Sequence, residues 1–270
     1  MCLEEAKSLE SISQGESPLP GRNARDPSKI VQRSDQSPKR RADTGNLPRR
    51  DSVSQMLQIL GIDLSGPRNI ADTCGAIFRQ DGAAIRFVDS IPAAADLSVL
   101  SAVSRLAAQG PLIVGIDAPL SYNPGGGDRP SDAALRQLVR QRGGRIGIMP
   151  PTMIRMVYLT LRGISLARTI QMSEPQRGIR IVEVHPGAAM LLRGATSADL
   201  ASVKKVTRAR LRLLDWLGNQ GLNGIPQRDG ATDHFVMACA ACLAAWSWDK
   251  GTPAWCFPAS PPLHPYDFAC

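Results

Sequence analysis

Two short segments of this chain share one pattern, an apolar run that ends in Gly-Ile-Asp. Residues 57–63 read Leu-Gln-Ile-Leu-Gly-Ile-Asp, and residues 112–117 read Leu-Ile-Val-Gly-Ile-Asp. Near-continuous apolar character over so few residues is typical of a strand that is covered on both faces. The pattern therefore predicts two buried strands, each of which ends in a carboxylate.

The residues between these two segments predict how the strands are connected. Two β-prone runs, 74–80 and 84–90, are joined by Asp81-Gly82, a pair that favours a tight hairpin because both central positions need positive φ. Apolar residues then recur at near-helical spacing over 97–106. A helical crossover into a buried strand implies parallel pairing, so we expect strands one and four to lie side by side.

The remaining pattern completes an α/β fold. We predict helices over 131–142, 152–168, 198–217 and 229–246, and a fifth strand over 178–185. The expected fold is an RNase H-like mixed five-stranded sheet in the order 3-2-1-4-5. Helices flank this sheet, and extra helices are inserted between strands four and five. A doubly wound nucleotide-binding fold is the alternative, but it would not begin with a three-strand meander.

The ordered domain is expected over residues 56–256, with tails at both ends. Residues 1–55 lack hydrophobic periodicity and carry basic runs, which predicts a disordered tail; alternatively, translation starts at Met56, directly before the first strand. Residues 257–270 are rich in Pro and are expected to be irregular. No secretory signal, membrane span, disulfide framework or zinc spacing is evident, and Cys239 and Cys242 are interpreted as small buried hydrophobes. We therefore expect a cytoplasmic protein without a membrane partner.

The carboxylates that end the two matching strands are the first candidate site. If the strands are parallel neighbours, Asp63 and Asp117 emerge at the same edge of the sheet, where open α/β sheets bind ligands. Adjacent carboxylates repel each other, and a hard divalent cation such as Mg²⁺ or Mn²⁺ relieves that repulsion. The alternative is that each Asp only caps a turn after its strand. Because two matching strands both end in Asp, a shared metal site is favoured over two separate caps.

Other polar residues are also expected near this edge of the sheet, but each of them has a structural alternative. Glu183 lies in an apolar run near the end of the fifth strand, where it either takes part in the site or forms an ion pair with an Arg. Asp229 and Asp233 begin the last helix, a position that the helix dipole also explains. His185 either orients a water or phosphate or is a core or turn residue.

Four motifs in order resemble a prokaryotic family of predicted RNase H-like nucleases, domain-of-unknown-function family 429. They are Gly61-Ile-Asp, Gly115-Ile-Asp-Ala-Pro-Leu, Glu183-Val-His-Pro, and the segment that begins with Asp229-Gly-Ala-Thr-Asp233. The resemblance covers roughly residues 57–255. It implies that Asp63, Asp117, Glu183 and Asp233 are the acidic, metal-binding positions. One departure is His234, because the family usually has Ala after this last Asp.

A basic segment between the fourth and fifth strands resembles another region that the family shares. Arg129, Asp132, Arg136 and Arg155 are its charged residues, and Arg129 and Arg155 are candidate phosphate ligands. The alternative for these side chains is a solvated basic helix face.

Together these features predict a metal-dependent nuclease that hydrolyses phosphodiester bonds in RNA, DNA or a branched nucleic acid. Three or four carboxylates around Mg²⁺ or Mn²⁺ would suit that chemistry. The alternatives are a nucleotide- or phosphate-binding enzyme of the actin-like ATPase type and a non-catalytic nucleic-acid-binding protein that keeps the fold. The net charge of +8 is compatible with a nucleic-acid partner. The sequence leaves open whether the protein forms a homodimer.

Overall fold

The computed structural model describes residues 56–173, 177–227 and 230–270. The predicted tail over 1–55 and Asp229 lie outside the described residues. The strands are β1 (Gln58–Asp63), β2 (Cys74–Asp81), β3 (Ala84–Ile91), β4 (Leu112–Asp117), β5 (Arg180–Val184), β6 (Leu222–Asn223), β7 (Cys256–Phe257) and β8 (Phe268–Ala269). The α-helices are α1 (Asp96–Ala107), α2 (Pro130–Gln141), α3 (Val157–Ser173), α4 (Pro186–Leu192), α5 (Ser197–Ser202), α6 (Thr207–Asn219) and α7 (Asp233–Asp249), and a 3-10 helix spans Ile70–Asp72.

The strands form one mixed sheet in the order β6-β3-β2-β1-β4-β5-β8-β7. β1 is parallel to β4 and β4 to β5, whereas β2 is antiparallel to both β1 and β3. The mixed α/β class is thus confirmed, and α2 and α3 are inserted between β4 and β5. The predicted number of five strands is wrong, because β6 pairs with β3 at one edge and β8 and β7 extend the sheet beyond β5.

The C-terminal segment differs from the irregular tail that its Pro content predicts. Phe268–Ala269 forms β8, which runs parallel to β5, and Phe268, Ala269 and Cys270 are all buried. These apolar residues cover the backbone edge of β5, which would otherwise be left unpaired. The Pro-rich segment therefore becomes part of the sheet because residues 268–270 are buried.

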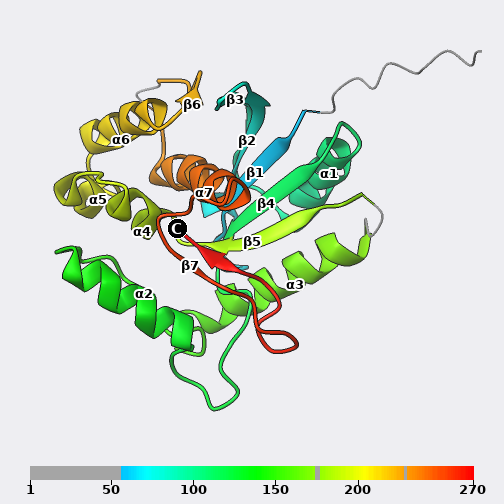
Figure 1. Ribbon diagram of the computed structural model, residues 1–270, viewed down its shortest axis with the longest axis vertical. Coiled ribbons are helices and arrows are strands. Elements are labelled where there is room, and N and C mark those ends of the chain that lie inside the picture. Colours follow the sequence, from blue (N-terminus) through cyan, green and yellow to red (C-terminus); the bar gives the residue numbers. More distant parts are fainter. Residues whose placement is uncertain (1–55, 174–176, 228–229) are drawn as a thin grey trace, which may run out of the picture. The chain divides into compact units, whose positions relative to one another are not determined.

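Helices cover both faces of the sheet (Figure 1). One buried cluster joins Ile59 of β1 and Ile113 of β4 to α7, and another joins Leu60 and Val114 to α1 and α3. Since successive side chains of a strand point to opposite faces, odd-numbered positions of β1 and β4 face α7. Asp63 and Asp117 fall on that face, where each strand ends.

Gly61 and Gly115 let α7 approach the two central strands closely. A Cβ atom at Gly61 would lie 2.3 Å from the carbonyl oxygen of Ala238, and one at Gly115 would lie 2.8 Å from the Cβ of Ala245. The facing side of α7 consists of small residues, including Cys239 and Cys242, both of which are buried free thiols. The Gly of each Gly-Ile-Asp motif thus permits the packing that brings the start of α7 close to the Asp.

The predicted single helix over 198–217 is in fact two helices, α5 and α6, separated by a turn at 203–206. Arg210 stabilises the turn, since its Nη1 donates to the carbonyl of Val203 at 3.0 Å and its Nη2 donates to Oγ1 of Thr207 at 2.9 Å. Two β-branched residues, Val206 and Thr207, stand at the junction and weaken helix continuity. The break leaves Lys204 exposed in the turn.

None of the helices in the described ranges has the length and apolar character that a membrane span needs.

Candidate active site

Asp63 and Asp117 lie directly beside each other at the ends of β1 and β4. The parallel register pairs every residue of the two motifs, from Gln58 with Leu112 to Asp63 with Asp117. Both side chains lie on the face of the sheet that α7 covers, close enough for the charge of Asp63 to act on Asp117. The predicted juxtaposition of the two strand-end carboxylates is therefore present in the structure.

The surroundings of the pair disfavour two negative charges. Burial raises the pKa of Asp117 well above its ordinary value, and the charge of Asp63 and the hydrogen bond with it raise that pKa further. Burial also raises the pKa of Asp63, although the hydrogen bond with His234 opposes this rise. Both burial and the neighbouring negative charge therefore disfavour full ionisation of the pair.

His234 is the immediate partner of Asp63. Its Nδ1 lies 2.7 Å from Oδ2 of Asp63, and its Nε2 lies 3.8 Å from Asp72 and 3.9 Å from Asp233. The hydrogen bond with Asp63 raises the pKa of His234 above its ordinary value, and three nearby carboxylates contribute to the rise. In the sequence, His234 was visible only as a departure from the family motif.

A cavity of about 270 Å³ opens beside the carboxylate pair. Its charged or titratable lining residues are Asp63, Asp117, Arg129, Asp132, Glu183, His185 and Lys204. The positive charge of Lys204 reaches both Asp63 and Asp117 and opposes the rise of their pKa values. The sequence gives no signal for Lys204, which falls inside the single helix predicted over 198–217.

Glu183 does not project in the same direction as the Asp pair. Its partner across the parallel ladder is Ile116, the residue before Asp117. Because adjacent side chains alternate between faces, Glu183 leaves the sheet on the face opposite to Asp117, although it still borders the cavity. On that face both of its carboxylate oxygens accept hydrogen bonds from Arg129, and Oε2 also accepts one from the amide of Leu120.

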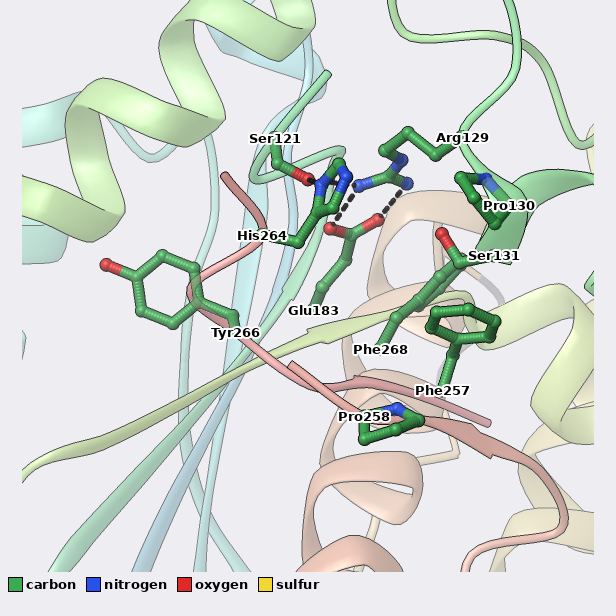
Figure 2. Close-up of a pocket in the computed structure, with 10 residues that line it drawn as sticks. All are labelled: Ser121, Arg129, Pro130, Ser131, Glu183, Phe257, Pro258, His264, Tyr266 and Phe268. Atoms are coloured by element: carbon green, nitrogen blue, oxygen red, sulfur yellow. Dashed lines mark hydrogen bonds and ion pairs between the residues drawn. The ribbon is translucent and has the colours of Figure 1, made fainter. Parts of the chain in front are cut away.

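Arg129 is buried between two acids, as Figure 2 shows for its contacts with Glu183. Its Nη1 lies 2.8 Å from Glu183 Oε2 and 3.0 Å from Ser121 Oγ, and its Nη2 lies 2.5 Å from Glu183 Oε1 and 2.7 Å from Asp132 Oδ1. Its Nε donates to Asp132 at 2.9 Å. All five guanidinium N–H groups thus have partners inside the protein. Arg129 has no donor left for a phosphate in this arrangement, and Glu183 has the ion pair that the sequence suggested as its alternative role.

Of the predicted site residues Asp233, Arg155 and His185, only His185 lines the cavity. Asp233 is the first residue of α7 and does not line the cavity. Arg155 is exposed in the turn before α3 and does not line it either. His185 does line the cavity, but its Nδ1 accepts from the amide of Ala188 and caps α4. Burial lowers the pKa of His185. A neutral ring whose Nε2–H points to the carbonyl of Gly147, 3.4 Å away, fits these contacts.

These positions decide how well the residues fit a metal ion. Within residues 56–173, 177–227 and 230–270, no three His, Cys, Asp or Glu side chains converge to hold one. Asp63 and Asp117 remain as two adjacent carboxylates that line the cavity. Mg²⁺ is commonly held by one or two carboxylates and completes its shell with waters and phosphate oxygens. The Asp63–Asp117 pair fits one such ion, whereas a four-acid site does not fit this arrangement.

The family model described as "Protein of unknown function (DUF429)" matches residues 61–262. The chain belongs to this family. The DUF429 match begins in β1 and includes Asp63, Asp117, Glu183 and His234, so it spans the whole candidate site. No curated protein matches the chain.

Proposed function

We propose that this DUF429 protein is a metal-dependent nuclease that hydrolyses phosphodiester bonds, with Asp63 and Asp117 as the ligands of one Mg²⁺ or Mn²⁺. The observation that carries the proposal is the parallel register that sets the two carboxylates side by side in the lining of a cavity. The succession β3-β2-β1-β4-β5 within the sheet supports an RNase H-like core. A bound divalent cation would supply positive charge to activate water and to neutralise a phosphate.

The residues of the chain have separate roles in this proposal. Asp63 and Asp117 hold the cation, and His234 fixes the orientation of Asp63 through its 2.7 Å contact. Lys204 attracts the phosphate, since its charge already reaches the carboxylate pair. Glu183 and Arg129 are a buried structural ion pair. We therefore propose one cation held by two carboxylates instead of the four-carboxylate site that the family resemblance implies.

Cleavage assays test the proposal directly. The purified protein is incubated with single-stranded and duplex DNA and RNA in the presence of Mg²⁺ or Mn²⁺. We expect cleavage that needs the metal and that Asp63→Asn and Asp117→Asn each abolish while the proteins keep their circular dichroism spectra. Asp89→Asn is the matched control, because Asp89 is an exposed acid on β3.

Two results would contradict the proposal. One is the absence of cleavage of every substrate with both metals. The other is cleavage that survives in Asp63→Asn or Asp117→Asn. If ATP raises the melting temperature of a protein that does not cleave, a nucleotide-binding enzyme becomes the better interpretation.

A further inference from the structure

A second and larger cavity, of about 670 Å³, adjoins the first. Its walls come from residues 143–149 after α2, from α5 and from the turn that follows α5. Asp117, His185 and Lys204 line both cavities, as do Gly147 and Met149. The two cavities are therefore continuous, and the second one, called the groove below, extends from Asp117 past Lys204 to the residues of α5.

Three cationic side chains line this groove. Arg145, Lys204 and Lys205 are exposed, and among the described residues none of them has an ion pair or a side-chain hydrogen bond. By contrast, two cations on other helices have acidic partners. Arg136 of α2 pairs with Asp128, and Arg212 of α6 pairs with Asp199. Unpaired cations along a groove that contains one acid, Asp117, favour an anionic ligand.

Most of the remaining wall of the groove is apolar, although His185 and Ser197 also line it. Ile146, Leu200 and Met237 line it, together with Met149 at the junction with the first cavity. A cavity of this size and apolar character is suited to enclosing a flat organic group. Methionine sulfur makes favourable contacts with aromatic rings, and Met149 and Met237 are both partly exposed here. An anionic ligand with a flat aromatic part has the chemistry of a nucleotide.

We propose that the groove binds one unstacked nucleotide of a single strand, with its base against the apolar wall and its phosphate at Lys204. This inference rests on the proposed function and names the substrate class of the same site. A base can enter the groove only after it leaves its stack, which is easiest in a single strand and costs pairing and stacking in a duplex. The exposed cations hold the backbone through charge, so binding weakens with added salt.

Binding measured without metal tests the inference separately from cleavage. A short fluorescein-labelled single strand is titrated with the full-length protein in EDTA, and the same sequence is titrated as a duplex. We expect the single strand to bind about tenfold more tightly than the duplex, which corresponds to the energy of about one stacked base. Equal or tighter binding of the duplex would overturn the proposal.

Two variants test the two halves of the groove. Lys204→Glu reverses the charge at the junction, and Ala198→Trp fills the groove from an exposed position on α5. Each is expected to weaken single-strand binding about tenfold or more. Arg208→Glu and Ala133→Trp are the matched controls, because both positions are exposed on neighbouring helices and neither lines the groove. The controls should retain the affinity of the wild type.

The outcomes separate this inference from the proposed function. If the wild type cleaves nucleic acid but Lys204→Glu and Ala198→Trp bind the single strand as tightly as their controls, the groove inference is wrong and the nuclease proposal stands. If the variants lose binding while no cleavage is found with either metal, the groove inference stands and the nuclease proposal is wrong. A melting temperature close to that of the wild type confirms that each variant is folded.

Discussion

The Nδ1 atom of His234 lies 2.7 Å from Oδ2 of Asp63, across 171 residues of sequence. This hydrogen bond connects the start of α7 to the end of β1, and it raises the pKa of His234 above 6.5. A protonated His234 therefore persists above pH 6.5 and competes with a cation for the negative charge of Asp63.

We expect the affinity for Mn²⁺ to increase as the pH rises through the raised pKa of His234. In His234→Asn this part of the pH dependence should be lost, because Asn keeps a polar contact but does not titrate. Calorimetric titration of Mn²⁺ between about pH 6 and pH 9 measures both proteins over the relevant window. Identical pH profiles for the two proteins would show that His234 does not compete with the cation.

Asp117→Asn is expected to stabilise the protein near neutral pH. The pKa of Asp117 is raised above 3.8 in the folded protein, so the folded state keeps a proton that the unfolded state releases. The stability that this proton contributes is complete below about pH 4 and is lost as the pH rises through the folded pKa. Asn has no proton to lose, so the variant gains relative to the wild type as the pH rises.

We expect an increase in melting temperature of roughly 2–4 °C at pH 7.5, the change that about 1 kcal/mol produces in a domain of this size. Thermal melts from about pH 4 to pH 8 should show the difference shrinking toward the acidic end. A variant that is less stable than the wild type at neutral pH would contradict a raised pKa of Asp117 in the folded protein.

Gly61→Ala is expected to destabilise the fold strongly. The new Cβ would lie 2.3 Å from the carbonyl oxygen of Ala238 and 2.6 Å from the amide nitrogen of Cys242, both backbone atoms of α7. Because α7 cannot yield without losing its contacts with β1, we expect a loss of about 3 kcal/mol or more. Urea unfolding monitored by circular dichroism measures the change.

Gly218→Ala is the control for this substitution. Gly218 lies in α6, and a Cβ there would meet no atom within 4 Å. We expect a small gain of about 0.5–1 kcal/mol, because Ala is the better helix former. Similar effects at the two positions would mean that α7 does not pack against Gly61 as closely as described.

Arg129→Leu tests whether Arg129 is structural. The side chain is 3% exposed and forms ion pairs with both Asp132 and Glu183, so its removal leaves buried carboxylates without a cation. Loss of one partner from such a pair costs about 3–5 kcal/mol. Arg136→Leu is the matched control. Its pair with Asp128 is 22% and 33% exposed, and its loss should cost about 0–1 kcal/mol.

Chemical denaturation of both variants measures this difference. If Arg129→Leu keeps the stability of the wild type but binds nucleic acid more weakly, Arg129 contacts the substrate and the structural assignment is wrong.

Much of the central sheet was predictable from local pattern. The apolar runs, the Asp-Gly hairpin and the helical spacing before β4 each depend on residues close together in the chain. They were sufficient to pair β1 with β4 and to bring Asp63 next to Asp117. The two edges of the sheet were not predictable, because β6 and β8 are two-residue strands that owe their pairing to distant segments.

The rest of the site depended on register and on packing between distant segments. The alternation of side chains along β5 shows that Glu183 points to the opposite face from Val182 and Val184. Only the pairing of β5 with β4 shows that Glu183 aligns with Ile116, and only the folded chain brings it to Arg129. His234 reaches Asp63 because Gly61 allows α7 to lie close to β1. The sequence thus determined which residues end the central strands, since that information is local. The tertiary structure alone decided which of the acids face one another, because the alignment of strands and helices is set by contacts between segments far apart in the chain.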